Sequence, residues 1–151
     1  MPNFRGHLLG GVGAYICALF VFQHTSFSLI EHSSWLSATL AGALFPDIDI
    51  KSKGQRLYLK VLTLVLLVCL CLQAYIPLIM VLALFFSSLI MPHRGLFHDL
   101  WFISGVVIVT DLFLVVFIPQ RNEEIAIVSL FFLLGVVSHL TLDKGIKKTF
   151  R

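Results

Sequence analysis

The sequence predicts an all-α, polytopic membrane protein with about six transmembrane helices in a single domain over residues 1–151. Hydrophobic residues make up 58% of the chain and charged residues only 13%, whereas a soluble domain is nearer half apolar and a quarter charged. The apolar residues also occur in long blocks, without the amphipathic pattern of a soluble helix, and mean hydropathy is +0.96. Because a membrane-spanning helix needs about 20 predominantly apolar residues, these blocks are candidate spans.

The first two candidate spans differ in how clearly they are bounded. Residues 8–22 form the first, which starts near His7 and carries glycines and alanines that let membrane helices approach closely. The second ends at residue 45 and begins at either residue 27 or residue 34. A helix from residue 34 is too short to cross a bilayer. Either Glu31 and His32 therefore lie at the far interface, or this element is re-entrant.

Four more apolar blocks complete the predicted set. A basic loop over residues 51–56 leads into the third block, which is the clearest span of the chain. Pro77 then marks a tight turn into a short fourth span, and a polar loop over residues 119–124 separates the last two. The blocks are residues 57–76, 78–91, 100–118 and 125–142.

The distribution of positive charge supports an even number of spans. With the amino terminus in the cytoplasm, six spans leave Arg121 alone outside and put the other ten of the 11 basic residues on the cytoplasmic side. This is the asymmetry that the positive-inside rule describes, and an odd number of spans would scatter these residues. Both termini are therefore expected in the cytoplasm. The ten are Arg5, Lys51, Lys53, Arg56, Lys60, Arg94, Lys144, Lys147, Lys148 and Arg151.

The same topology brings four short polar motifs to the cytoplasmic face. Ionisable residues are costly at membrane depth and tend to be kept there for function. In the last motif, His139 and Asp143 are four residues apart on a helix and share one face of it. A loop-to-helix junction at Gly95 would bring His93 and His98 together. The candidate metal ligands are His7, Asp47, Asp49, His93, His98, His139 and Asp143.

These ligand types indicate which ions the site suits. Imidazole and carboxylate together fit zinc, manganese or iron, and the three cysteines lack the spacing of a thiolate site. Seven ligands are too many for one tetrahedral ion and about right for two. Paired ions favour hydrolysis of phosphoesters, in which one ion activates water and both stabilise charge. We expect one or two divalent ions, zinc first, with manganese or iron as alternatives.

Several charged residues near the ligands have two interpretations each. His7 is either a ligand or an interfacial histidine. Arg94, a candidate catalytic residue, either holds a phosphate in bidentate fashion or only sets topology. Asp99, the second candidate catalytic residue, either orients a histidine or caps a helix. Asp111 lies about a dozen residues further on and is expected near the outer face, outside the site.

The order of these motifs resembles the YdjM-like family, described as LexA-regulated, membrane-bound, predicted metal-dependent hydrolases. The resemblance implies a multi-pass protein of the inner (plasma) membrane whose His and Asp residues bind metal. Members often have a histidine where Ile50 stands here, and small hydroxyl residues where Phe97 and Asp99 stand. These departures leave either a trimmed site or a self-complementing homodimer. The motifs are GH at Gly6-His7, PDID at Pro46 to Asp49, KGQR at Lys53 to Arg56, HRGLFH at His93 to His98 and HLTLD at His139 to Asp143.

Together these features predict a metal-dependent hydrolase of a lipid or lipid-linked phosphoester, acting at the cytoplasmic membrane face by metal-activated water. A membrane lipid is the expected partner, and no nucleic acid is expected to bind. Two alternatives stay open: a metal transporter or sensor that uses the same ligands, and a non-catalytic membrane partner whose site is vestigial.

Overall fold

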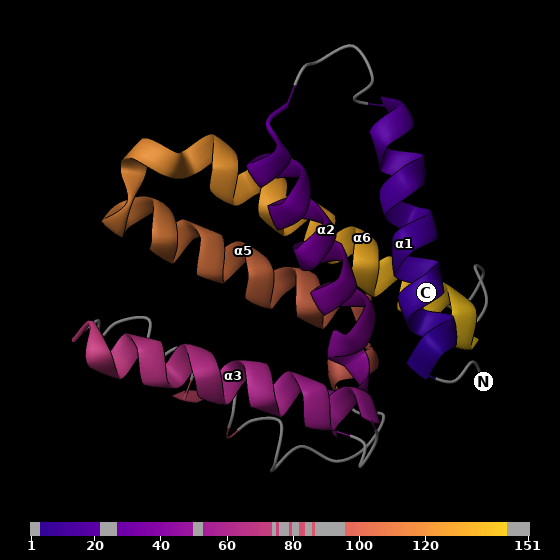
Figure 1. Cartoon of the computed structure of the whole chain (residues 1–151), viewed down its shortest axis with the longest axis horizontal. Helices are drawn as coiled ribbons and strands as arrows, with labels where there is room; N and C mark the ends of the chain where they lie inside the picture. Colours follow the sequence, from indigo (N-terminus) through magenta and orange to yellow (C-terminus); the bar gives the residue numbers. More distant parts are fainter. Residues whose placement is uncertain are drawn as a thin grey trace.

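The structure is a computed structural model that describes residues 4–21, 27–49, 53–73, 75, 79, 82–83, 86 and 96–144. All regular secondary structure in these residues is helical, which confirms the all-α prediction. The α-helices are α1 (Phe4–Val21), α2 (Leu29–Leu44), α3 (Lys53–Cys71), α5 (Leu100–Phe117) and α6 (Asn122–Lys144), and the 3-10 helices are η1 (Phe45–Asp49), η2 (Leu96–His98) and η3 (Pro119–Arg121) (Figure 1).

Four of the described helices are long and apolar enough to cross a membrane: α1, α3, α5, and α6 together with η3. The helix α2 has 16 residues and is shorter than these. The predicted fourth span, residues 78–91, lies largely outside the described residues, although Ile79, Leu82, Ala83 and Phe86 are helical. A multi-span membrane protein is therefore supported, and the count of six stays a prediction.

Three predicted helix boundaries are wrong by about a turn: the starts of the first and third spans and the end of the third. The helix α1 begins at Phe4, one turn before the predicted start, so that His7 lies in its first turn. The helix α3 begins at Lys53 and ends at Cys71, so that most of the predicted basic loop is its first turn. Lys, Gln and Arg are good helix formers, and the charges of Lys53 and Arg56 are compatible with the first turn of a helix. A positive φ of 53° at Gln73 marks the turn after α3.

The start of α2 is decided by a capping box at Ser28. The Ser28 hydroxyl accepts a hydrogen bond from the Glu31 backbone N–H (3.3 Å), and the Glu31 carboxylate accepts one from the Ser28 backbone N–H (2.7 Å). This reciprocal pair satisfies two backbone donors at the helix start. Of the two predicted starts, the one near residue 27 is therefore confirmed.

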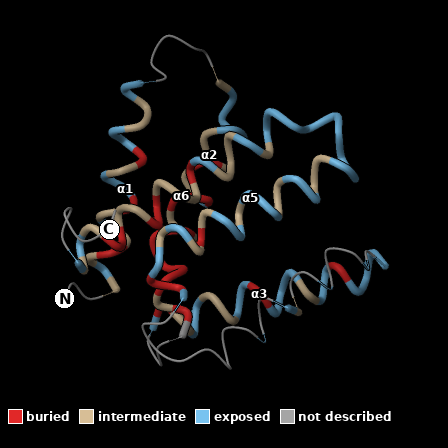
Figure 2. The backbone as a smooth tube through the Cα atoms, turned by 180° about the vertical axis from the view of Figure 1, so that it is seen from behind, coloured by how far each residue is buried: buried red, intermediate tan, exposed pale blue. Residues whose placement is uncertain are grey.

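The helices α2 and α6 form the centre of the molecule and meet through two glycines. A Cβ atom on Gly42 would lie 1.9 Å from the Phe132 carbonyl oxygen, and one on Gly135 would lie 2.0 Å from the Thr39 carbonyl oxygen. Only glycine permits this backbone-to-backbone approach. Buried residues concentrate where α2, η1 and α6 come together, whereas α3 and α5 extend to one side and are exposed over much of their length (Figure 2).

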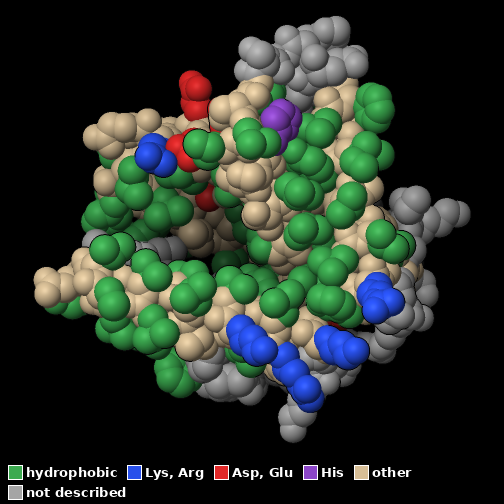
Figure 3. All heavy atoms as spheres, viewed as in Figure 1, with side chains coloured by type: hydrophobic (Ala, Val, Ile, Leu, Met, Phe, Trp, Pro, Cys, Tyr) green, Lys and Arg blue, Asp and Glu red, His purple; other side chains and the backbone are tan. Residues whose placement is uncertain are grey.

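The surface is largely apolar, with the basic side chains gathered at one end. Exposed basic residues of the described chain are Arg5, Lys53, Arg56 and Lys60 near the starts of α1 and α3, Lys144 at the end of α6, and Arg121 at the far end of α5. Figure 3 shows the first group along its lower edge. This segregation agrees with the predicted charge asymmetry, and the orientation of the termini stays a prediction.

Candidate metal centre

Four segments that lie far apart in the sequence meet at the end of the molecule where α1 and α3 begin. The first turn of α1 supplies His7, and η1, which continues α2 directly, supplies Asp47. The short η2 supplies His98, and the last two turns of α6 supply His139 and Asp143. Each side chain therefore projects from helical backbone, which fixes its direction better than a loop would.

Three imidazoles and two carboxylates converge there. The Asp47 carboxylate lies 3.5 Å from His139 Nε2, 3.8 Å from His98 Nε2 and 4.0 Å from His7 Nε2. The Asp143 carboxylate lies 3.6 Å from His139 Nε2 and 3.5 Å from His7 Nε2. One ligand atom from each of Asp47, His98, His139 and Asp143 lies within 4.8 Å of all the others. These four residues can share one ion, and His7 lies against them.

The ring of His139 is held in one orientation by the end of α2. Its Nδ1 lies 2.8 Å from the Ala43 carbonyl oxygen. A carbonyl only accepts, so Nδ1 donates this hydrogen bond and the other ring nitrogen, Nε2, is turned toward Asp47 and Asp143. Metal-binding histidines commonly have this kind of support on the second ring nitrogen. The ring of His7 stacks on His139, with centroids 3.9 Å apart and planes 16° from parallel.

The arrangement fits a divalent ion. Two ligands at 2.0–2.1 Å on a tetrahedral ion lie about 3.3 Å apart, close to the nitrogen–oxygen separations found here. His139 Nε2 and Asp143 Oδ1 are buried and have no hydrogen bond in the part of the chain that the structure describes, although buried polar atoms usually have one. Two carboxylates also balance the charge of a divalent cation, which lowers the energetic cost of burying it.

A comparison with known families bears on this site. The model of the family described as "YdjM inner membrane protein" matches residues 1–148. The chain belongs to the YdjM family. The resemblance predicted from the motifs is thereby confirmed, and membership together with four long apolar helices supports a membrane location. Searches of curated proteins and of solved structures found no match. The family description names a location and no reaction.

In this YdjM-family protein the structure brings five of the seven predicted ligands together. Asp49 is the last residue of η1, but its side chain lies outside what the structure describes, as does all of His93. The candidate catalytic residue Arg94 also lies outside the described residues. Asp99 caps α5: its carboxylate accepts hydrogen bonds from the backbone N–H groups of Trp101 (2.8 Å) and Phe102 (3.5 Å). Its catalytic role stays a prediction.

The electrostatics of the centre favour an ionised carboxylate. Burial raises the pKa of Asp47, but the neighbouring imidazoles of His139, His7 and His98, when protonated, lower it by more. The pKa of Asp47 therefore lies below its ordinary value. The carboxylate is the form that binds a cation.

Lys144 is the residue near the centre that sequence reasoning missed, because it was counted only as a basic residue of the cytoplasmic tail. Its Nζ donates a hydrogen bond to the His98 carbonyl oxygen, and so joins the end of α6 to η2. Its position directly after the candidate ligand Asp143 is the sequence feature that could have indicated its proximity to the centre.

Proposed function

We propose that this protein is a metal-dependent hydrolase that cleaves a phosphoester in a lipid or lipid-linked substrate at the cytoplasmic membrane face. The observation that carries the proposal is the buried convergence of Asp47, His98, His139 and Asp143, with His7 against them, at the ends of membrane helices. A divalent ion bound there supplies Lewis acidity toward phosphoryl oxygens and lowers the pKa of water. Zinc is the first candidate for this ligand set, with manganese or iron as alternatives.

The exposure of the ligands indicates the side from which a substrate approaches. The Asp47 side chain is 20% exposed, whereas those of His7, His98, His139 and Asp143 are 0–7% exposed. Asp47 therefore lies at the open edge of the centre, and the other ligands close it from the protein side. A headgroup that reaches this edge meets two carboxylates and imidazoles held in fixed positions, which is the pre-organisation that catalysis of this kind requires.

The charge around the centre suits an anionic headgroup. Exposed Lys53 and Arg56 begin α3 next to η1, and Lys144 ends α6. Basic residues at a membrane surface attract anionic lipids, each by about 1 kcal/mol. Arg94, between the predicted ligands His93 and His98, is proposed to hold the phosphoryl group in bidentate fashion.

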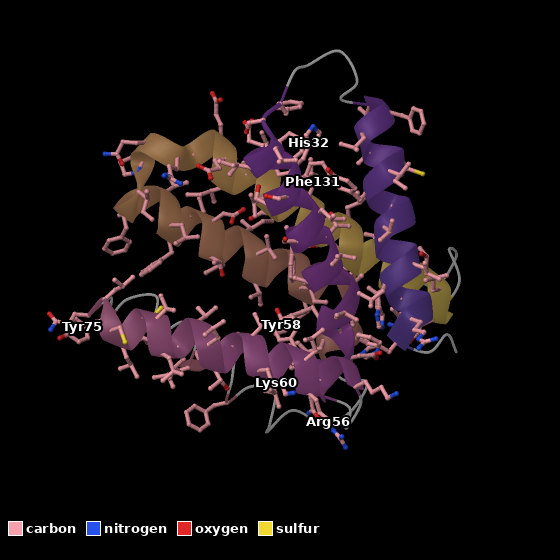
Figure 4. All side chains as sticks on the ribbon, viewed as in Figure 1. His32, Arg56, Tyr58, Lys60, Tyr75 and Phe131 are labelled. Carbon is pink, nitrogen blue, oxygen red and sulfur yellow. The ribbon has the colours of Figure 1, made fainter. Side chains whose placement is uncertain are left out.

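The proposal is tested by metal content and turnover measured together. The protein is purified in mild detergent, its metal is quantified per chain, and phosphate or headgroup release is followed from lipid phosphomonoesters and phosphodiesters. We expect one or two ions per chain, and activity that a chelator and His139→Ala abolish. His32→Ala is the matched control, since His32 lies near the start of α2, beside Tyr15 and far from the centre (Figure 4). Absence of both metal and turnover in the folded wild-type protein would refute the proposal.

The two rival functions predict different results in the same experiments. A non-catalytic protein with a vestigial site shows no turnover of any lipid phosphoester. A transporter moves the ion across a vesicle membrane and needs polar groups along the path; the pair of Asp111 and Ser129 between α5 and α6 is the observation in its favour. Ion uptake into vesicles that Asp111→Ala abolishes would support it.

A further inference from the structure

A cavity of about 370 Å³ lies between α2, α3, α5 and α6, apart from the metal centre. The space-filling view is hollowed in this region, between α3 and the α5–α6 pair (Figure 3). Tyr58 reaches it from α3 (Figure 4). Most of the other lining side chains are apolar, including Ala41, Phe45, Ile103 and Val107. We call this cavity the slot.

The slot is elongated along α5. Its lining on that helix runs from Ile103 to Asp111, eight residues or about 12 Å at helical rise. The Ile103 end is the one near the metal centre, because Phe45 and Ile103 belong to the same buried cluster as Phe97 and Leu140, the neighbours in sequence of His98 and His139. Phe45 also stands two residues before Asp47 in η1. The segments that carry the ligands therefore also form the near end of the slot.

The far end of the slot is polar. The Ser129 hydroxyl donates a hydrogen bond to the Asp111 carboxylate at 2.7 Å, and Thr110 lines the same end. Ionisable residues at membrane depth are rare and mark function. A hydrocarbon chain that packed against this pair would bury its polar atoms without forming a new hydrogen bond, which is unfavourable. The pair therefore limits how far a chain can extend.

We propose that the slot binds one hydrocarbon chain of the lipid substrate, with the Asp111–Ser129 pair as the floor that sets the accepted chain length. The identity of that lipid as the substrate rests on the proposed function. The slot is large enough, since an apolar cavity of 150 Å³ already holds benzene. Three of its four helices, α3, α5 and α6, are candidate membrane spans, so hydrocarbon is the medium around it. Its near end adjoins the segments that hold the candidate metal ligands, where the lipid headgroup would lie.

Photolabelling tests the occupant without requiring turnover. The metal-free protein is placed in vesicles that contain phosphatidic acid with a diazirine on one acyl chain, and labelled residues are mapped by mass spectrometry. We expect label at Val107 and Thr110, which line the slot, in excess over Val109 and Leu112, which are 67% and 64% exposed on the same helix. Equal labelling of both sets would overturn the proposal.

A filled slot provides the matched comparison. Ala41→Phe adds a ring inside the slot, and slot labelling should fall severalfold because the ring occupies space that the hydrocarbon chain would fill. Val109→Phe adds the same ring type on an exposed face of α5 and should leave slot labelling unchanged. Unchanged labelling in folded Ala41→Phe protein would overturn the proposal.

Chain-length selection tests the floor. In a series of phosphatidic acids of increasing chain length, competition against the probe should peak at a longer chain for the double variant Asp111→Ala, Ser129→Ala than for the wild type. An identical length profile would refute the floor. These outcomes are distinguishable from those that test the proposed function. Slot labelling without hydrolysis would support lipid binding in the slot and refute the hydrolase. Hydrolysis without slot labelling would support the hydrolase and refute lipid binding in the slot.

Discussion

The close crossing of α2 and α6 predicts that a substitution outside the metal centre will weaken metal binding. In Gly42→Ala the new Cβ would lie 1.9 Å from the Phe132 carbonyl oxygen, whereas real Cβ atoms essentially never approach closer than 3.0 Å. Backbone cannot rotate away as a side chain can, so the helices must separate by the difference, at least 1.1 Å. Gly135→Ala meets the Thr39 carbonyl oxygen at 2.0 Å and requires a similar separation.

This separation acts on the metal centre through one hydrogen bond. The bond from His139 Nδ1 to the Ala43 carbonyl joins the same two helices next to the crossing and is 2.8 Å long. A shift of 1.1 Å carried fully to it would lengthen it to roughly 3.9 Å, beyond the range of a hydrogen bond. Loss of the partner that orients a metal-binding histidine typically lowers metal affinity by about 10–100-fold. We expect that loss in both variants.

The assay is metal affinity in detergent, measured by competition with a chromophoric chelator. Gly13→Ala and Gly105→Ala are the controls, since a Cβ at either meets nothing within 4 Å and alanine favours the helix by about 1 kcal/mol. The three atoms nearest to a Cβ on Gly10 belong to the side chains of Leu142 and Ser138, which can move, so the metal affinity of Gly10→Ala should lie between those of the controls and of Gly42→Ala. Circular dichroism identifies variants that fail to fold. If Gly42→Ala and Gly135→Ala do not fold, the milder Gly10→Ala still tests the effect on metal affinity. Wild-type affinity in folded Gly42→Ala protein would refute the reasoning.

Three further predictions concern pH, Lys144 and Ser28. Bound metal should fall as pH is lowered from about 7.5 to about 5 in dialysis, because ligands must lose protons to bind; retention at the lower pH would contradict a histidine-rich centre. Lys144→Met removes the hydrogen bond to the His98 carbonyl and should lower metal affinity severalfold, whereas Lys60→Met, on exposed α3, should not. Ser28→Ala removes the cap of α2 and should cost about 1 kcal/mol in the free energy of unfolding, with metal affinity unchanged; an unchanged unfolding midpoint would contradict this role.

Much of the candidate centre is predictable because its signals are local. A histidine or aspartate in an otherwise apolar chain stands out, and the i, i+4 spacing of His139 and Asp143 is readable without a structure. The predicted topology with an even number of spans then places His7, Asp47 and His98 at the same membrane face. These steps need only hydropathy and charge, the strongest signals that a membrane sequence offers.

The rest depends on contacts between distant residues, which leave no local signal. The Ala43 carbonyl that orients His139 is backbone, and any residue at position 43 would provide it. Gly42 and Gly135 can each be recognised in the sequence as small residues, but nothing in the sequence indicates that their helices cross at these positions. The start of α3 was mistaken because the charges of Lys53 to Arg56 suggested a loop, whereas side chains at a helix end can reach water without leaving the helix.

The centre is assembled from the first and the last described helices and from segments between them. His7 and Asp143, whose side chains lie 3.5 Å apart, belong to the first and the last described helices, and Asp47 and His98 come from segments between them. A chain still emerging from the insertion machinery has no complete ligand set until α6 has joined α1 and α2. Because an ion that binds only the finished arrangement stabilises it, a metal bound there would lock α1, η1, η2 and α6 together, and chains in which one of these segments is misplaced would lack that stabilisation.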